Sequence, residues 1–328
     1  MAVILSWLAV SNAMWWVLQQ ILLGRRIEKT ELPDDPIFII GHWRSGTTLL
    51  HELLVLDSRH SYPDTYMCFV PNHFLVSGWL FRPLMGFLLP ARRPMDNMSA
   101  GWGQPQEDEF ALCNMGVPSP YLTIIFPNRP PQCQEYLDFE GVSSEDRKRW
   151  QAALLWFLKC VTFQKPGRIV LKSPPHTARI EVLAEMFPKA RFIHITRDPY
   201  VVFPSTLNLW RRLYRDQGLQ VPKCRDLEEH VLETFVQMYD AYERDRGAID
   251  PKHLCEVRYE DLVDDPVGQM QAIYNKLGLD GFEQAQPALD RYVASKKDYK
   301  TNRYEISAET REEITKRWRD YIQRYGYA

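Results

Sequence analysis

One stretch of sequence decides the fold: Ile37-Phe38-Ile39-Ile40-Gly41-His42-Trp43-Arg44-Ser45-Gly46-Thr47-Thr48. Its four apolar residues and closing glycine are typical of a strand that is buried on both faces of a parallel sheet. Glycines five positions apart allow a loop whose backbone N–H groups point inward, and the helix that starts near Thr47 adds partial positive charge. The stretch therefore predicts a strand, an anion-binding loop and a helix, with hydroxyl donors from Ser45, Thr47 and Thr48.

The glycine spacing is that of a P-loop, but one position differs. Nucleotide triphosphatases place a lysine directly after the second glycine, where this chain has Thr47, and they hold magnesium with help from a strand-end aspartate. Here a later predicted strand ends in Lys172 instead, and Arg44 supplies a positive charge inside the loop. Two fixed cations suit a ligand whose leaving group is a phosphate and whose transferred group is itself an anion.

Three further apolar runs each precede polar residues and a helical pattern. They cover residues 168–171, 191–195 and 254–257, with helices expected at about 177–187, from about 199 toward 215, and at 267–277. Ligands of open parallel sheets bind beyond the carboxyl ends of the strands, so the polar residues after each run should converge on one site. The alternation predicts an α/β protein with a P-loop-like three-layer fold around a central parallel sheet.

A long insertion separates the first two predicted strands, and we expect it to be mostly helical. One segment of it is crowded with large apolar residues: Phe69, Phe74, Trp79, Leu80, Phe81, Leu84, Phe87, Leu88 and Leu89. Such a run can be ordinary core, the wall of an apolar substrate pocket or a surface that touches a membrane. No internal repeat or low-complexity tract is visible, so residues 34–328 are predicted to form a single domain.

The amino-terminal residues 1–33 are considered separately. Residues 1–24 contain no charged side chain and approach the length of a bilayer span, but polar residues interrupt them and Arg25 and Arg26 follow them. We favour an amphipathic helix that packs on the domain or lies in a membrane interface over a helix that spans the bilayer. In the interfacial alternative, Trp7, Trp15 and Trp16 would lie at the level of the headgroups.

The net charge and the cysteine spacing limit the kinds of ligand and partner that the chain can be expected to bind. The 40 Lys and Arg residues against 42 Asp and Glu residues give a net charge of -2, so no overall positive field favours nucleic acid. The six cysteines lie far apart and form no Cys-x-x-Cys pair, which argues against a metal site. They are interpreted as buried, reduced thiols of a cytoplasmic protein, with a disulfide between distant cysteines as the alternative and with membrane association left open.

Two phosphate motifs together resemble a known family. The sequence G-x-x-R-S-G-T-T between a strand and a helix resembles the 5′-phosphosulfate loop of sulfotransferases that use 3′-phosphoadenosine 5′-phosphosulfate (PAPS). That family also has an Arg and a Ser, eight residues apart after a later strand, which bind the 3′-phosphate; here they correspond to Arg197 and Ser205. The segments 171–176 and 259–262 are similar to the branch that carries Arg instead of Lys in the loop. The resemblance extends from about Pro36 to the carboxyl terminus.

This resemblance implies a set of cofactor-binding residues and no metal. The implied set is Arg44, Ser45, Gly46, Thr47, Thr48, Arg197 and Ser205. Some members of the wider family close the 3′-phosphate with a late Arg-Lys-Gly turn, which this chain lacks. The nearest basic segment contains Lys300 and Arg303, and we hypothesise that these two residues cover the cofactor.

Five residues are candidates for catalysis. By analogy with phosphoryl transfer, Arg44 would stabilise the bridging oxygen and the sulfonate, and Lys172 would share that charge. His176 could remove the proton of the acceptor, because an imidazole titrates near neutral pH. Its rivals are Glu107 and Glu109, in an acidic run that could equally be a helix amino-terminal cap.

The predicted function is sulfuryl transfer from PAPS to a hydroxyl of a small or lipid-like acceptor. The lipid-like preference comes from the apolar insertion. Two alternatives remain: a P-loop kinase or NTPase, which Thr47 and Lys172 disfavour, and a non-catalytic, membrane-associated nucleotide-binding module, which the tryptophan-rich amino terminus suggests.

Overall fold

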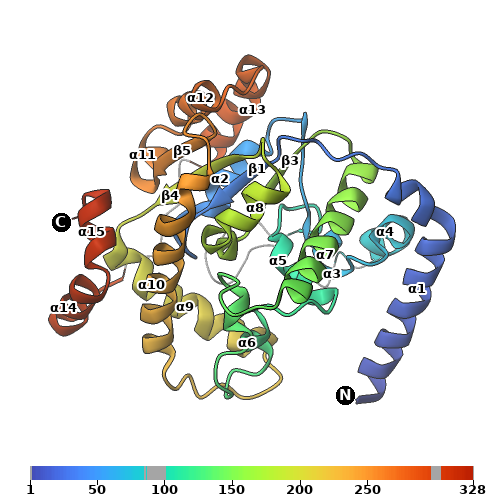
Figure 1. The fold of residues 1–328 in the computed structure, drawn as a ribbon, viewed down its shortest axis with the longest axis horizontal. Coiled ribbons are helices and arrows are strands. Elements are labelled where there is room, and N and C mark those ends of the chain that lie inside the picture. The colour runs from blue at the N-terminus through green and yellow to red at the C-terminus, as the bar shows by residue number, and fades with distance from the viewer. Residues whose placement is uncertain (1, 85, 87–100, 297–303, 328) are drawn as a thin grey trace.

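The computed structural model describes residues 2–84, 86, 101–296 and 304–327, with side chains from residue 6 onward. Within these residues, five strands form one sheet in the order β2-β3-β1-β4-β5, and every neighbouring pair is parallel (Figure 1). The strands are β1 (Ile37–Ile40), β2 (His60–Ser61), β3 (Arg168–Lys172), β4 (Arg191–Thr196) and β5 (Leu254–Arg258). The four apolar runs found in the sequence are strands, and β2 is an additional short strand at the edge.

The central strand β1 organises the core. Ile37 pairs with Val170 of β3 on one side and with Arg191 of β4 on the other. The polar residues that follow these three parallel strands therefore lie together at the carboxyl end of the sheet. Ile37 and Ile39 belong to one apolar cluster, whereas Phe38 and Ile40 belong to another. A strand whose alternate residues enter separate cores must be covered on both faces, which explains the continuous apolar run.

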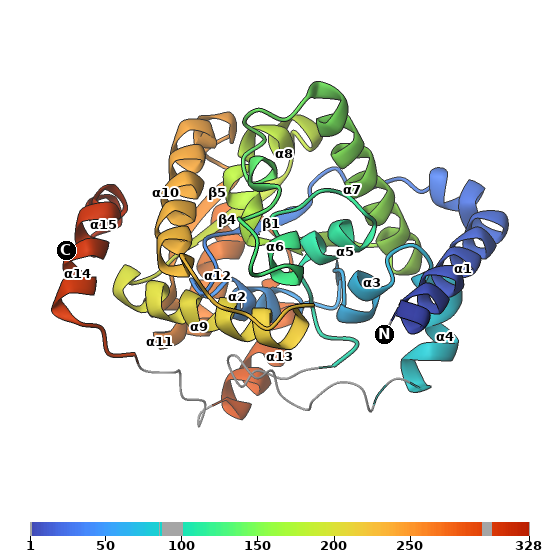
Figure 2. The same cartoon turned by 90° about the horizontal axis from the view of Figure 1, so that it is seen from below.

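Helices form the two outer layers (Figures 1 and 2). The layer with Ile37 and Ile39 contains α2 (Thr47–Leu54), α11 (Tyr259–Asp264), α12 (Pro266–Leu277) and α13 (Phe282–Ser295). The layer with Phe38 and Ile40 contains α7 (Ser144–Gln164), α8 (Ile180–Met186), α9 (Pro199–Gln217), α10 (Leu227–Asp245), α14 (Ala308–Arg317) and α15 (Arg319–Tyr325). The predicted three-layer α/β fold is confirmed.

The regular structure in the described part of the insertion between α2 and β3 is almost entirely helical, in line with the prediction. Besides β2 and α7 it contains α3 (Thr65–Phe69), α4 (Phe74–Leu84), α5 (Asp108–Asn114), α6 (Leu122–Ile125) and the 3₁₀ turn η2 (Gln134–Tyr136). Two more 3₁₀ turns follow later, η3 (Pro174–Ala178) and η4 (Arg246–Ala248). The helix predicted from about 177 to 187 is therefore η3 followed by α8.

The amino-terminal helix α1 (Ala2–Glu28) lies beside α4 and α7 at one end of the molecule (Figure 1). Gln19 attaches it: this side chain is fully buried, donates to the carbonyl oxygen of Asn72 (2.9 Å) and accepts from the N–H of Leu75 (3.1 Å). In the described part of the chain, no helix is both long enough and apolar enough to cross a bilayer. The division at residue 33 stays a prediction.

Candidate active site

The loop after β1 needs both of its glycines. Gly41 has φ 145°, and a Cβ there would lie 2.5 Å from the carbonyl oxygen of Ile195. Gly46 has φ 105°, and its Cβ would lie 2.3 Å from the ring of Tyr259. Within the loop, Ser45 is buried and donates to the carbonyl oxygen of His42 through its backbone N–H (3.1 Å) and its hydroxyl (2.7 Å). The loop is therefore a fixed turn, packed against β4 and α11, that leads into α2.

The two predicted phosphate motifs contact each other directly. Nε of Arg44 donates to Oγ of Ser205 over 2.9 Å, and Nη1 of Arg197 donates to the carbonyl oxygen of Arg44 over 2.9 Å. The Arg197 guanidinium also lies 4.0 Å from the centre of the Tyr259 ring. We call Arg44, Arg197 and Ser205 the phosphate end of the site. Positive charge and hydroxyl donors here form the kind of cradle that holds anionic groups.

Lys172, at the end of β3, forms an ion pair with Glu107. Its Nζ lies 2.6 Å from Oε1 of Glu107, and only 2% of the Lys172 side chain and 13% of the Glu107 side chain are exposed. The hydroxyl of Tyr121 donates to the other oxygen of Glu107 and accepts a hydrogen bond from Nε1 of Trp43, 3.0 Å away. Because Trp43 belongs to the loop after β1, this chain of hydrogen bonds connects Glu107 to the loop.

His176 lies in η3 and is completely buried. Its Nε2 is 2.6 Å from Oδ2 of Asp108, and Oγ of Ser173 donates to the other oxygen of Asp108 over 2.9 Å. Burial would raise the pKa of Asp108, but the attraction and hydrogen bond of His176, together with the hydrogen bonds from Ser173 and the backbone, hold that pKa below its ordinary value. The ring also packs edge-on against Phe38 and Trp150.

The third acidic residue in the run forms another buried pair. Both oxygens of Glu109 accept from Arg179, at 2.5 and 3.1 Å, and the hydroxyl of Ser119 donates to Glu109 as well. Neither side chain of the Glu109–Arg179 pair is exposed. We call Glu107-Asp108-Glu109 the acid run. Its three carboxylates contact three basic side chains that follow one another in the sequence from the end of β3 onward: Lys172, His176 and Arg179. The N-cap residue Glu107 makes no side-chain capping hydrogen bond. The acid run therefore links the start of α5 to the end of β3 and the residues after it, instead of acting as a simple helix cap.

The other predicted cofactor-binding residues are two threonines of the loop helix and two basic residues near the carboxyl terminus. Thr47 is buried and Thr48 is partly exposed at the start of α2. Lys300 and Arg303 lie outside the described residues. The sequence analysis missed Tyr121 and Trp43, and no local signal marks them: an aromatic residue whose hydroxyl or N–H contacts a distant carboxylate looks like any core residue.

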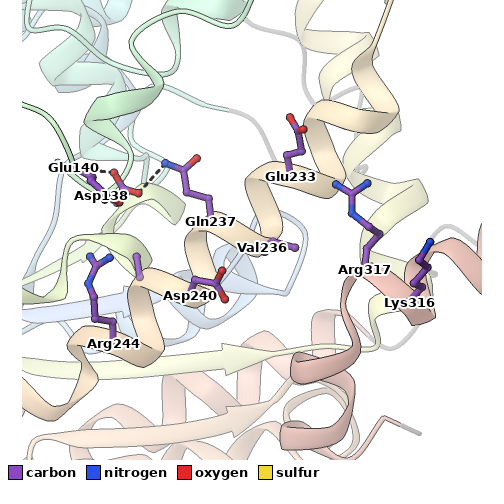
Figure 3. A pocket seen from close by; sticks show the side chains of 10 residues that line it. Asp138, Glu140, Glu233, Val236, Gln237, Asp240, Arg244, Lys316 and Arg317 are labelled. Atoms are coloured by element: carbon purple, nitrogen blue, oxygen red, sulfur yellow. Dashed lines mark hydrogen bonds between the residues drawn. The ribbon is translucent and has the colours of Figure 1, made fainter.

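A separate surface cavity of about 580 Å³ lies between α10 and α14 (Figure 3). Its lining mixes acidic and basic side chains, among them Glu233, Asp240, Arg244 and Lys316, and a hydrogen bond from Gln237 to Asp138 (2.8 Å) crosses part of it. These residues belong to neither phosphate motif, so the cavity is distinct from the site. In the residues that the structure describes, no group of three or more metal-ligating side chains occurs.

Comparison with known proteins identifies the family. A sequence profile described as "Sulfotransferase family" matches residues 36–284. The chain is 48% identical, over 326 residues, to the omega-hydroxy-beta-dihydromenaquinone-9 sulfotransferase Stf3 of Mycobacterium bovis and to the protein of the same name from Mycobacterium tuberculosis. Each match covers 99% of this chain and 84% of the relative.

Solved structures agree on the fold. Sulfotransferase STF9 from Mycobacterium avium has a TM-score of 0.72 at 20% identity, covering 93% of this chain and 80% of that one. Sulfotransferase STF1 from Mycobacterium tuberculosis has a TM-score of 0.68 at 19% identity, covering 92% and 81%. The chain belongs to the sulfotransferase family, and the predicted class of enzyme, a PAPS-dependent sulfotransferase, is confirmed.

Proposed function

We propose that the phosphate end holds PAPS, with the loop from Gly41 to Thr48 around the 5′-phosphosulfate and with Arg197 and Ser205 on the 3′-phosphate. The observation that carries this proposal is the direct contact of Arg44 with both residues of the second motif. Two motifs that touch through their donors can bind two phosphate groups of one nucleotide. The fixed glycine loop and the clustered donors fit a ligand that is anionic at both ends.

PAPS supplies the sulfuryl group: the bond between sulfur and the bridging phosphate oxygen breaks as the acceptor oxygen bonds to sulfur. Arg44 is positioned to stabilise the negative charge that develops at the leaving phosphate. Lys172, held at the end of β3 by Glu107, adds positive charge close to the loop. We assign these two residues to charge stabilisation.

Glu107 is the better candidate for the base. Its carboxylate is partly exposed, and hydrogen bonds from Lys172 and Tyr121 orient it, so it can accept the proton of the acceptor hydroxyl. His176 is fully enclosed, and its Nε2 is already engaged by Asp108. Glu109 is occupied by Arg179 in the same way. We therefore assign His176 and Glu109 structural roles.

The acceptor that fits best is a lipid with a hydroxyl group, specifically a hydroxylated isoprenoid quinone. The support is the 48% identity, over nearly the whole chain, to enzymes named for an omega-hydroxylated menaquinone derivative. The large apolar residues of the insertion are consistent with a long hydrocarbon substrate, because a chain of that kind needs apolar walls.

We further propose that α1 and α4 attach the enzyme to a membrane surface. Both helices leave large apolar residues in solvent: Trp7, Leu8, Val10, Met14, Trp16, Val17, Leu18, Ile21 and Leu22 on α1, and Trp79 and Leu84 on α4. Arg25 and Arg26 provide cations in the last turn of α1 for lipid phosphate. An apolar surface with tryptophans and nearby arginines is typical of interfacial helices.

Flotation with vesicles containing anionic lipid tests this membrane proposal. The double variant Ile21→Glu/Trp79→Glu should remain with the unbound protein, whereas the control Val221→Glu should float with the vesicles as the unaltered protein does. Val221 is the matched control because it is 87% exposed and lies between α9 and α10. Equal flotation of both variants would contradict the proposal.

Two measurements test the nucleotide and the acceptor. The first is the melting temperature with adenosine 3′,5′-bisphosphate (PAP), the product left by PAPS, against ATP with magnesium, because a ligand that binds the native state raises it. PAP should stabilise the protein more. The second is transfer of label from PAPS carrying radioactive sulfur to a quinone with a terminal hydroxyl, with the same quinone lacking that hydroxyl as control. Transfer to neither compound would overturn the acceptor, and a preference for ATP would overturn the nucleotide assignment.

A further inference from the structure

The carboxyl-terminal helix α15 reaches the turn that presents Arg197. The hydroxyl of Tyr321 accepts a hydrogen bond from the backbone N–H of Arg197 and donates one to the backbone carbonyl of the same residue, both at 3.0 Å. One side chain thus satisfies both backbone polar groups of Arg197, directly after β4 ends. The two residues are separated by 124 positions, so this contact exists only in the folded chain.

A second tyrosine near the carboxyl terminus holds the next peptide of the same turn. The N–H of Asp198 donates to Oε1 of Glu260 over 3.0 Å, and the hydroxyl of Tyr327 donates to Oε2 of that carboxylate over 3.0 Å. The rings of Tyr321 and Tyr327 are stacked, 5.9 Å apart and tilted by 5°. Both tyrosines therefore restrain the backbone around Arg197, one directly and one through Glu260.

The rest of this carboxyl-terminal segment is anchored elsewhere. Trp318 stacks on Phe235 of α10 at 3.7 Å, and its indole N–H donates to the carbonyl oxygen of Leu232. Tyr321 packs against Tyr239 of α10 at 4.5 Å. Figures 1 and 2 show α14 and α15 next to α10 in both views. Burial keeps the pKa of Tyr321 well above its ordinary value, so its hydroxyl remains both a donor and an acceptor.

We propose that Tyr321 is a positioning residue for the 3′-phosphate: it fixes the turn after β4 so that the Arg197 guanidinium is already in place when the nucleotide binds. Holding a binding group in place beforehand removes part of the ordering cost of binding. This inference rests on the proposed function, because it acts through the assignment of Arg197 to the 3′-phosphate. It predicts that α15 sets selectivity for a phosphate that it does not itself touch.

Affinities for two nucleotides test the inference. PAP carries the 3′-phosphate and adenosine 5′-phosphate lacks it, so the ratio of their dissociation constants isolates the 3′-phosphate. Tyr321→Phe keeps the ring and removes the hydroxyl, which leaves two backbone groups of Arg197 without a partner. We expect its Kd for PAP to rise about tenfold and its Kd for adenosine 5′-phosphate to change less than about twofold.

Tyr325→Phe is the matched control. The Tyr325 hydroxyl lies in the same aromatic cluster but donates to Glu243 of α10 (2.8 Å), so neither dissociation constant should change. Equal weakening of both nucleotides by Tyr321→Phe would mean a structural role only, and an unchanged Kd for PAP would also overturn the inference. Should Tyr321→Phe unfold, Tyr327→Phe replaces it, with a smaller loss of the same selectivity expected.

Arg197→Ala separates the two proposals. If this variant keeps the preference for PAP, the assignment of Arg197 fails and the inference falls with it. If Arg197→Ala loses the preference but Tyr321→Phe keeps it, the assignment stands and only the positioning role is wrong. If both lose it, Tyr321→Phe added to Arg197→Ala should cause no further loss, because both changes act on one contact.

Discussion

The two ends of the candidate site hold their basic groups differently. At the phosphate end, Arg44 donates to the hydroxyl of Ser205, and Arg197 donates to a carbonyl oxygen and lies over an aromatic ring. Behind β3, three basic groups each contact a carboxylate of the acid run. A hydroxyl or a ring face orients a guanidinium without offsetting its charge, whereas a carboxylate offsets part of the charge of the basic group that it contacts. We therefore expect the phosphate end to govern anion binding and the acid run to govern proton transfer and stability.

The largest expected effect is on the acid run at Glu107. Glu107→Gln keeps an oxygen to accept from Lys172, replaces the oxygen that faces Tyr121 by an NH2 group and cannot accept the proton, so kcat should fall by about 10²- to 10⁴-fold. The Kd for PAP should stay unchanged, and both follow from single-turnover kinetics with a binding titration. A retained kcat would return the role of base to His176, and the variant His176→Asn would then have to lose turnover.

An effect of similar size is expected on stability at the opposite end of the acid run. Glu109→Gln leaves the buried Arg179 without its compensating charge, which should lower the free energy of unfolding by about 3–5 kcal/mol. Denaturant titration measures this change. The control is Asp34→Asn, which breaks the solvent-exposed pair with Lys189 and should leave stability nearly unchanged. Equal results for the two variants would remove the distinction between buried and exposed pairs.

A substitution at the phosphate end should instead reduce turnover without reducing stability. Arg44→Ala should reduce turnover by about 10²- to 10³-fold, because it removes charge stabilisation at the leaving phosphate, while the free energy of unfolding changes little. Steady-state kinetics and a thermal melt on one preparation check both parts. Arg149→Ala, which removes an exposed arginine of α7, serves as the control. Unchanged turnover in Arg44→Ala would contradict its role and weaken the contrast between the two ends.

The smallest predicted effect is a dependence of stability on pH. His42 in the loop and His51 on α2 are buried, and burial lowers the pKa of each to about 3; Lys172 adds to the effect at His51. The folded chain then binds fewer protons than the unfolded chain, whose histidines have a pKa of about 6.5. The free energy of unfolding should fall as the pH drops below that value, by about 2 kcal/mol per histidine at pH 5.

His51→Leu isolates one share of this dependence. Denaturant titrations at pH 7 and pH 5 should show a smaller loss of stability for the variant than for the unaltered protein. An identical loss would mean that His51 is already protonated in the folded state. Both ring nitrogens of His51 have no hydrogen-bond partner in the described residues, which favours the neutral form.

Four of the strands could be predicted because each is a short, mainly apolar run followed by polar residues, and their observed ends lie within one residue of the predicted ends. The edge strand β2 could not, because two residues leave no periodic pattern. The placement of Arg44 and Arg197 at the same end of the sheet was likewise predictable, since parallel strands present the residues at their carboxyl ends together. The direct contact of Arg44 with Ser205 of α9 was not predicted.

The partners of the acid run could not be predicted. Glu107 and Lys172 are 65 positions apart in the sequence, and their contact depends on how the helical insertion folds back over β3. The sequence shows three acidic residues at a helix start, a pattern that a simple cap would also produce. The choice between Glu107 and His176 needed side-chain burial, which composition and spacing do not reveal.

One crowded glycine has a consequence for how this site can change. A methyl group at position 46 would clash with the ring of Tyr259, and the same ring also contacts the guanidinium of Arg197. Even alanine there would strain the left-handed turn and shift the aromatic platform beneath the arginine. In the proposed binding mode, a single added carbon would therefore disturb the residues assigned to both phosphates, so that a change at position 46 would alter the two motifs together.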